Sequence, residues 1–163
     1  MSQAALDIRL ADYRDPADAH AVVTLLDAYA RDPAGGGTPL EAGVLAGLPE
    51  ALATRPQAFS VLAYDGEQPV GLINCIEGFS TFACKPLVNV HDVVVLESHR
   101  GQRVTQRMLA RVEQEARARG ACKLTLEVLS GNRSALRAYE REGFANYQLD
   151  PAFGSAMFLQ KKL

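Results

Sequence analysis

The stretch of the sequence best suited to chemistry is the turn R-G-Q-R-V-T-Q at residues 100–106. It follows an apolar, β-branched run at residues 88–96 and opens a segment with helical periodicity. A strand that leads into the amino end of a helix presents unpaired backbone N–H groups, which bind anions. The stretch therefore predicts a place for a phosphate-bearing cofactor. Four arginines would form a basic stripe on one helical face, suited either to phosphates or to solvent: Arg100, Arg103, Arg107 and Arg111.

The elements before this turn are predicted from local signals. Asp15 and Pro16 mark the start of a helix, as its cap and its first residue. The pair Asp65-Gly66 is typical of a hairpin turn between two strands. We expect strands at residues 6–10, 59–64 and 70–76, and a second, weaker helix at residues 40–54.

The elements after the turn follow the same logic. Gly120 should end the helix that the turn opens, and Asn132 should cap the next helix, which Gly143 ends. The remaining segments alternate apolar and polar residues and are predicted as strands, at residues 121–129, 145–149 and 156–160.

Composition excludes several classes of protein. A chain of 163 residues is most economically a single domain, over residues 1–163, and a net charge of -2 offers no attraction for nucleic acid or an anionic membrane. No apolar run approaches the roughly 20 residues of a membrane span. The first ten residues lack the pattern of a signal peptide. Cys75, Cys84 and Cys122 have no paired spacing, so we expect no disulfide, no metal site and a cytoplasmic location.

A spaced motif in the last third of the chain indicates a family. The pattern N-x-x-A-x-x-x-Y-x-x-x-G-F is filled at every place, and L-E-V precedes it at residues 126–128. With the element order β-α-α-β-β-β-α-β-α-β, the chain resembles the GNAT N-acetyltransferase superfamily over nearly its whole length. The residues that fill the motif are Asn132, Ala135, Tyr139, Gly143 and Phe144.

The resemblance implies an α/β (α+β) fold. Its central sheet should be mixed and mostly antiparallel, with about seven strands and four flanking helices. The sheet should splay between its fourth strand, at residues 88–96, and its fifth, at residues 121–129.

The resemblance also implies acetyl-CoA as the acetyl donor. The family's pyrophosphate turn, Q/R-x-x-G-x-G/A, falls on residues 100–105, but Arg103 and Thr105 stand where the glycines would be. Because the donors are peptide groups, the site survives if these N–H groups still converge, and Arg103 would itself bind phosphate. The pantetheine would pair with the backbone of residues 93–95. The expected cofactor-binding residues are Val93, Val94, Val95, Arg100, Gly101, Gln102, Arg103, Val104, Thr105, Gln106, Asn132 and Tyr139.

The resemblance assigns Tyr139 as the acid that protonates the leaving thiolate. The acceptor amine must lose a proton before it attacks, so a base helps, and there are two candidates. His91 stands where many family members carry a glutamate, and Glu127 lies on the next predicted strand. The alternatives are a hydrogen-bonded core histidine and a carboxylate that fixes the sheet edge. Asp92 should point to the opposite face of the strand from His91.

The implied function is that of an acetyl-CoA-dependent N-acetyltransferase, acting by direct transfer on a primary amine. The acceptor would be a small molecule or a protein, with no nucleic acid or membrane partner, and homodimers are common in the family. The alternative is a GNAT-like module that binds acyl-CoA without catalysis. The replaced glycines favour this alternative and Tyr139 disfavours it.

Overall fold

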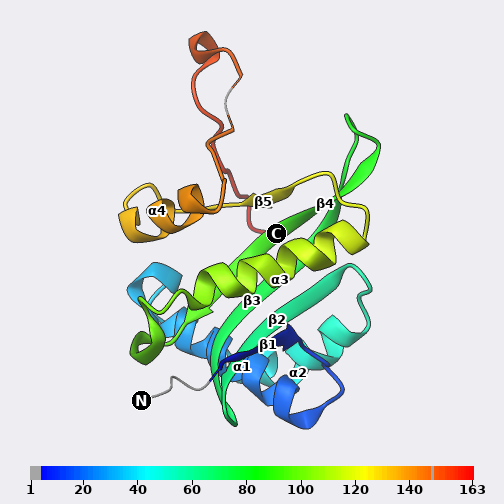
Figure 1. Cartoon of the computed structure of the whole chain (residues 1–163), viewed down its shortest axis with the longest axis vertical. Coiled ribbons are helices and arrows are strands. Elements are labelled where there is room, and N and C mark those ends of the chain that lie inside the picture. The colour runs from blue at the N-terminus through cyan, green and yellow to red at the C-terminus, as the bar shows by residue number, and fades with distance from the viewer. Residues whose placement is uncertain (1–4, 148) are drawn as a thin grey trace. The chain divides into compact units, whose positions relative to one another are not determined.

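The computed structural model describes residues 5–147 and 149–163, which form two compact units. The first unit runs to Leu126 and is a sheet with helices on its two faces, and the second begins at Glu127 (Figure 1). The single domain expected over residues 1–163 stays a prediction. The strands are β1 (Asp7–Leu10), β2 (Ala58–Asp65), β3 (Gln68–Ser80), β4 (Lys85–Val95) and β5 (Leu124–Leu126), and the helices are α1 (Pro16–Arg31), α2 (Ala42–Ala53), α3 (Val104–Ala118) and α4 (Arg133–Arg141).

The helices begin and end where the local chemistry requires. The Asp15 carboxylate accepts a hydrogen bond from the backbone N–H of Asp18 at 3.0 Å, and Pro16 takes the first position of α1. Gly120 follows α3 with a φ of 76°, a left-handed conformation that glycine adopts without steric cost. The predicted cap of α1 and the predicted stop of α3 are confirmed.

The sheet is mixed, as predicted. Its strand order is β1-β2-β3-β4-β5, with three antiparallel pairings followed by a parallel pairing of β4 with β5. The described residues also contain the four α-helices that were expected. The fold class is therefore confirmed as α/β with a mostly antiparallel sheet. None of the described helices has the length and apolar character needed to cross a membrane.

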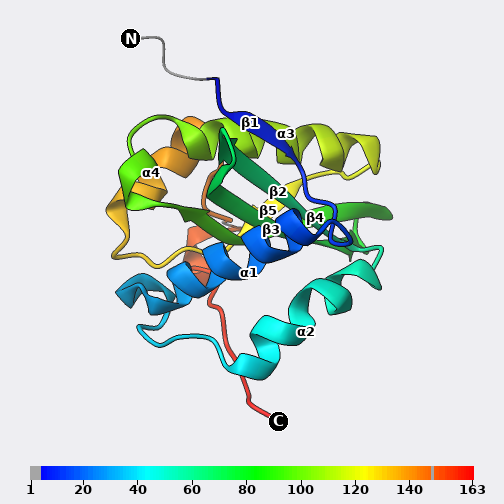
Figure 2. The ribbon, with the colours of Figure 1, turned by 90° about the horizontal axis from the view of Figure 1, so that it is seen from below.

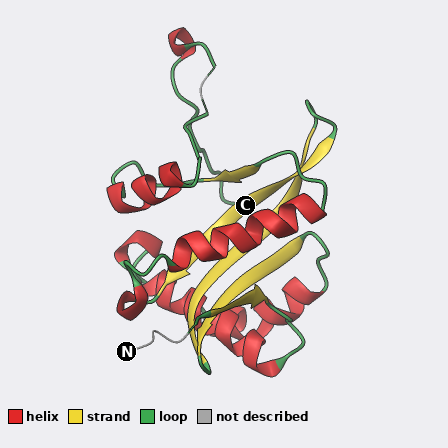
Figure 3. Ribbon diagram, in the orientation of Figure 1, coloured by secondary structure: helices red, strands yellow, loops and turns green. Residues whose placement is uncertain are grey.

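The predicted number of strands is wrong, because the described residues form five strands and not seven. The expected strands at residues 145–149 and 156–160 have no strand pairing, and residue 148 lies outside the described part (Figure 3). Apolar alternation makes a strand only where a neighbouring strand takes its hydrogen bonds and its apolar side chains are buried. The apolar side chains of this segment stay exposed, as at Phe158, which is 78% exposed.

A β-bulge at His91 changes the face of the sheet that β4 presents. Cys75 of β3 pairs with Val90, and Asn74 pairs with Asp92, so His91 has no partner on β3. In a regular strand, residues 90 and 92 would lie on the same face. The bulge instead places Val90 and Asp92 on opposite faces.

Different helices cover these two faces (Figure 2). On one face lies α3, and Arg119, just after its last residue, stacks 4.6 Å from the ring centroid of Phe59. Phe59 lies in one cross-strand row with Cys75 and Val90, so Val90 belongs to the α3 face. On the opposite face lies α1, and α2 contacts both α1 and β2.

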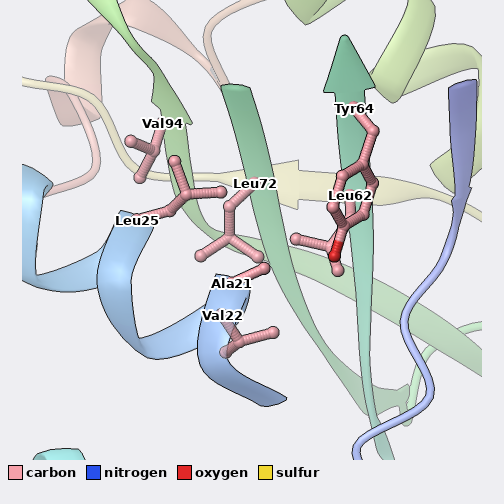
Figure 4. Close-up of a cluster of buried hydrophobic side chains, with 7 residues drawn as sticks. All are labelled: Ala21, Val22, Leu25, Leu62, Tyr64, Leu72 and Val94. Carbon is pink, nitrogen blue, oxygen red and sulfur yellow. The ribbon is translucent and has the colours of Figure 1, made fainter. Parts of the chain in front are cut away.

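A buried cluster joins α1 to the centre of the sheet (Figure 4). Its side chains come from α1, β2, β3 and β4, and each is 7% exposed or less. Burial of apolar surface contributes roughly 25 cal/mol per Å², so this cluster is a main source of stability for the first unit. Its members are Ala21, Val22, Leu25, Leu62, Tyr64, Leu72 and Val94.

On the other face, Gly71 allows α3 to lie close to the sheet. A Cβ atom at residue 71 would lie 2.9 Å from Met108 Cε and 3.2 Å from Ala63 Cβ. Both distances are shorter than the optimal carbon–carbon separation of about 3.5–4.0 Å. The absence of a side chain at residue 71 therefore leaves room for the end of the Met108 side chain against the sheet.

The carboxylate of Asp18 joins β1, β2 and the start of α1. It is 0% exposed and accepts four hydrogen bonds, at 2.6 and 2.7 Å from Arg9 Nη1 and Nη2, 2.9 Å from the backbone N–H of Asp12 and 2.8 Å from the Tyr64 hydroxyl. The guanidinium of Arg9 also stacks on Tyr64, 4.9 Å from the ring centroid. A buried charge is tolerated only when it is paired in this way.

These contacts change the pKa values of the Asp18 carboxyl group and the Tyr64 hydroxyl group. Burial acts to raise the pKa of Asp18, but the hydrogen bonds donated by Arg9, Asp12 and Tyr64 outweigh burial and lower this pKa below its ordinary value. Burial, together with the hydrogen bond to Asp18, raises the pKa of Tyr64 to about 12, so its hydroxyl remains a donor.

The lowered pKa of Asp18 predicts the sign of a pH dependence. A carboxylate whose pKa is lower in the folded state stabilises the fold above its unfolded pKa, near 3.9, and the stabilisation is lost as the pH falls. We expect Asp18→Asn to lower the free energy of unfolding at pH 7 by about 2–3 kcal/mol, because it removes charge-assisted hydrogen bonds. Urea unfolding from pH 7 down to pH 3.5 measures this loss, which should shrink at the acidic end.

Asp7→Asn is the matched control. Asp7 also contacts Arg9, at 3.2 Å, but its side chain is 63% exposed. Exposed ion pairs contribute about 0–1 kcal/mol, so this variant should change stability little at any pH. Equal losses in the two variants, or a pH-independent loss for Asp18→Asn, would contradict the buried carboxylate as the source.

Candidate functional site

The turn at residues 100–106 has backbone conformations that glycine favours, although one of the residues concerned is an arginine. Gly101 has a φ of 77° and Arg103 a φ of 60°, both in the left-handed region. Arg103 stands at the first of the two replaced glycines, and a left-handed conformation costs a side-chain-bearing residue on the order of 1–2 kcal/mol. The backbone at residue 103 therefore has a conformation that glycine adopts readily, although arginine is strained there.

The start of α3 presents unpaired N–H groups beside this turn. The first helical hydrogen bond runs from Arg107 N to Arg103 O at 3.2 Å, so the N–H groups of Val104, Thr105 and Gln106 lie before it. No side chain caps the helix, since Arg103 at the cap position makes no such hydrogen bond. The three donors and the helix dipole fit a phosphate group.

A side-chain contact ties the turn to the β2–β3 hairpin. His99, in the short 3-10 helix Glu97–His99, lies with its Nε2 3.2 Å from Asp65 Oδ2, and its Nδ1 lies 2.8 Å from Ser98 Oγ. Gln102 Nε2 donates to Ser98 O at 3.1 Å. These bonds hold the residues that precede the anion-binding groups.

The predicted arginine stripe is wrong. Arg100 and Arg103 precede α3, which begins at Val104. Arg107 Nη2 donates to Leu6 O at 2.9 Å. Of the others, Arg111 Nη1 lies 3.8 Å from Glu115 Oε2, and Arg100 Nη2 lies 3.6 Å from Asp32 Oδ2. Within the described part of the chain, Arg103 alone of the four is exposed without a hydrogen-bond or ion-pair partner, so it alone can meet a phosphate at no cost in existing contacts.

The predicted pantetheine edge lies on β4. Residues 93–95 pair with β3 on one side, whereas β5 pairs with β4 on the other side only at Val88–Val90. Among the described residues, no strand pairs with β4 on the β5 side from His91 to its end, as the predicted splay requires. Arg100 Nε already donates to Val95 O at 3.1 Å.

The two predicted bases lie in different surroundings. His91 is exposed at the bulge, so it is not the buried core histidine of the alternative interpretation. Glu127 lies one residue beyond the end of β5 at Leu126, and not on the strand as predicted. Asp92 contacts Asn74, at 3.1 Å, and not His91. His91 belongs to the first unit and Glu127 to the second.

The second unit carries Asn132 and Tyr139, the asparagine and tyrosine of the motif. Asn132 caps α4 as predicted, with its Oδ1 accepting from the backbone N–H of Ala135 at 3.2 Å. Tyr139 is half-buried and packs edge-on against Phe144, with ring centroids 5.9 Å apart. Asn132 precedes α4, which begins at Arg133, and its φ of -83° and ψ of 71° are not helical, so helical spacing does not place its side chain on the side of Tyr139.

Sequence reasoning missed a set of polar residues inside the sheet. Ser60, Asn74 and Asp92 lie in one cross-strand row and are joined by hydrogen bonds. The available signal was weak, because β3 also carries Glu77 and β4 also carries Asn89 and His91. The bulge that aligns Asp92 with the others has no signal in the sequence. The described residues contain no group of three or more His, Cys, Asp or Glu that could hold a metal ion.

Comparison with known proteins agrees with these features. The sequence profile of the Acetyltransferase (GNAT) family matches residues 11–144. Streptothricin acetyltransferase of Streptomyces lavendulae is 35% identical over 86 residues, which are 51% of this chain and 46% of that protein. The match therefore spans about half the length of this curated relative.

Solved structures share the fold at lower identity. Ribosomal-protein-alanine N-acetyltransferase from Brucella melitensis biovar Abortus 2308 has a TM-score of 0.75 at 21% identity, over 96% of this chain and 100% of that one. An aminoglycoside acetyltransferase from an uncultured soil metagenomic sample has a TM-score of 0.76 at 15% identity, over 96% and 97% of the two chains. At such identities the similarity shows the fold alone.

The left-handed backbone predicts the effect of restoring glycine at residue 103. Arg103→Gly should raise the free energy of unfolding by about 1 kcal/mol, because it removes the strain of a side chain at positive φ. Its affinity for CoA should nevertheless fall and depend less on salt, because an exposed guanidinium that binds phosphate is lost. Urea unfolding and calorimetric CoA titrations at two salt concentrations measure the two effects.

Arg100→Gly is the control, since this neighbouring arginine has an ordinary φ of -65°. It should lose stability, because glycine increases the entropy of the unfolded chain without relieving strain. Tighter CoA binding by Arg103→Gly would show that the arginine obstructs the turn.

Proposed function

Because the chain belongs to the GNAT acetyltransferase family, we propose that it moves an acetyl group from acetyl-CoA to a primary amine by direct transfer. The observation that carries the proposal is the φ of 60° at Arg103, where the backbone keeps a glycine-like conformation after the signature glycine is lost. Strained backbone of this kind is enriched at ligand-binding sites, which supports the proposal.

The first unit's residues have the donor chemistry that a pyrophosphate needs. The N–H groups of Val104, Thr105 and Gln106 would hold its oxygens, and Arg103 would add a charge-assisted hydrogen bond of about 1.5–3 kcal/mol. The unpaired edge of β4 at residues 93–95 would receive the pantetheine amides as an added strand. Bound acetyl-CoA would supply the thioester.

The second unit's residues would act on the other end of the donor. Oδ1 of Asn132 is used by the cap of α4, so its amide nitrogen is the group that would bind the pantetheine region. Tyr139 would give its phenolic proton to the thiolate as the carbon–sulfur bond breaks. His91 and Glu127, the bases predicted from the sequence, remain proposals.

The acceptor is proposed as a primary amine on a small molecule or a protein. The relatives support both kinds, since they include acetyltransferases of streptothricin, of aminoglycosides and of a ribosomal-protein alanine. The homodimer and the cytoplasmic location remain predictions.

A second candidate function is a GNAT-like module that binds acyl-CoA without catalysis. The observation that favours it is the replacement of both signature glycines, by Arg103 and Thr105. This module would bind CoA as the enzyme does, so binding and turnover must be measured separately.

Acetyl-CoA should stabilise the folded protein. A ligand that binds only the folded state at about 100 times its dissociation constant adds about 2.7 kcal/mol to the free energy of unfolding. Thermal unfolding with and without acetyl-CoA measures this gain, with adenosine as the control that lacks phosphates. Melting that is indifferent to millimolar acetyl-CoA would rule out both candidate functions.

Tyr139→Phe separates the enzyme from the binding module. The variant keeps the ring that packs on Phe144 and removes only the hydroxyl. It should leave acetyl-CoA affinity nearly unchanged and cut turnover by about 10²–10⁴-fold, the usual loss for a general acid. Steady-state kinetics on an amine found by screening measures the loss.

Tyr147→Phe is the matched control, because Tyr147 is a 63% exposed tyrosine of the same unit. Its turnover should equal that of the wild type. A Tyr139→Phe protein with wild-type turnover would leave Tyr139 with a packing role alone.

A further inference from the structure

A chain of hydrogen bonds crosses the sheet on its α1 face and ends at Asp92. The Tyr13 hydroxyl lies 2.8 Å from Ser60 Oγ, Ser60 Oγ donates to Asn74 Oδ1 at 2.6 Å, and Asn74 Nδ2 donates to Asp92 Oδ2 at 3.1 Å. Ser60 is 1% exposed and Asn74 is 7% exposed. Polar groups buried this deeply are costly in an apolar sheet unless every bond is made.

The donor-to-acceptor direction of these hydrogen bonds follows from the last residue, Asp92. An ionised carboxylate only accepts hydrogen bonds, so the Asn74 amide must turn its nitrogen to Asp92 and its oxygen to Ser60. The single hydroxyl proton of Ser60 then goes to Asn74, which leaves Tyr13 as the donor to Ser60. Burial raises the pKa of Tyr13, so its proton is retained. Every donor in the chain therefore points toward Asp92.

The second oxygen of the Asp92 carboxylate, Oδ1, lies outside this chain of hydrogen bonds. Asp92 is half-buried, and among the described residues its Oδ1 has no hydrogen-bond partner and no lysine or arginine pairs with it. Arg100, just beyond the end of β4, contacts Asp32 instead. Burial first, and then the charges of Asp92 and Asp32, raise the pKa of Tyr29. Of these two carboxylates, Asp32 has Arg100 as its cation, whereas Asp92 has none among the described residues. A partly buried carboxylate in this state is best satisfied by a cation that also donates hydrogen bonds.

We propose that Asp92, and not His91 or Glu127, receives the ammonium group of the acceptor and takes its proton. Tyr13, Ser60 and Asn74 are positioning residues, because they fix Oδ2 and leave Oδ1 for the acceptor. The inference rests on the proposed function and narrows the acceptor to a cationic primary amine.

The transfer balances with this assignment. The ammonium gives one proton to Asp92 Oδ1, and the freed lone pair forms the C–N bond with the acetyl carbon while the C–S bond breaks. The thiolate takes the proton of Tyr139, and the second proton lost by nitrogen returns to that phenolate through solvent. Asp92 then releases its proton to water, so the products are the N-acetyl amine, the CoA thiol and one proton.

Methylammonium chloride tests the site without any need for the true acceptor. The side-chain amide of Asn74, followed by ¹⁵N NMR, should shift saturably with methylammonium and not with tetramethylammonium, which has the same charge but no N–H donor. Asp92→Asn should weaken methylammonium binding at least tenfold, and Asp7→Asn, which removes an exposed carboxylate, should not. No shift, equal shifts with the two cations, or unchanged binding by Asp92→Asn would overturn the proposal.

The positioning role of Tyr13, Ser60 and Asn74 can be measured separately, through methylammonium binding and kcat. Ser60→Ala should weaken methylammonium binding and lower kcat while KM for acetyl-CoA stays unchanged, and Ser60→Thr, which keeps the hydroxyl, should restore both. Tyr13→Phe, which removes the first donor, replaces Ser60→Ala if that variant does not fold. A loss of stability without a change in binding or kcat would make the chain purely structural.

The two proposals fail in different ways. A wild-type protein without turnover on any amine would refute the proposed acetyl transfer, while the methylammonium titration still decides whether Asp92 binds ammonium. With turnover, Asp92→Asn should lower kcat by about 10²–10⁴-fold, and more than His91→Ala does. The reverse order would return the role of base to His91.

Discussion

The bulge at His91 forces β4 to change faces halfway along its length. Before it, Val88 and Val90 are 0% and 2% exposed, and Val90 lies on the α3 face, while after it Val94 is 6% exposed and packs under α1. Both helix layers can therefore take apolar side chains from one strand. Without the extra residue, Asp92 would lie beneath α3 among apolar side chains, where an unpaired carboxylate is costly.

Two carboxylates lie on the α1 side of the sheet, and they differ in how fully they are hydrogen-bonded. Asp18 accepts four hydrogen bonds, two of them from a guanidinium, so nothing further can bind it. Asp92 has one oxygen bonded to a neutral amide and the other without a partner in the described residues. The first arrangement fits a structural role, because the charge is fully compensated inside the fold. The second fits a binding role, because full compensation requires a group from outside.

Much of the fold could be predicted from the sequence because its signals are local. The cap at Asp15, the hairpin at Asp65-Gly66 and the cap at Asn132 each depend on a few neighbouring residues, and the structure has all three. The parts that failed depend on distant partners. The side chain of Arg107 bonds the backbone of Leu6, 101 residues away in sequence, which no helical periodicity could indicate.

The candidate site likewise has a part that the sequence could predict and a part that it could not. The turn and the Asn132–Tyr139 pair could be found because their spacing is a property of one segment. The chain that ends at Asp92 joins three strands through a bulge, and register of this kind is set by the whole sheet. The left-handed φ of Arg103 also has no signal in its residue type, since arginine gives no reason to expect it.

The close approach at Gly71 has a consequence for how this sequence can vary over evolutionary time. Met108 lies on the first turns of α3, and the atoms that approach residue 71 are the Cε and Sδ at the end of its side chain. A methyl group acquired at residue 71 would displace this end of the Met108 side chain, by a change of its rotamer or by its replacement with a shorter residue. Positions 71 and 108 should therefore covary among homologues, so that the genetic record would carry the imprint of how α3 packs on the sheet at two buried residues.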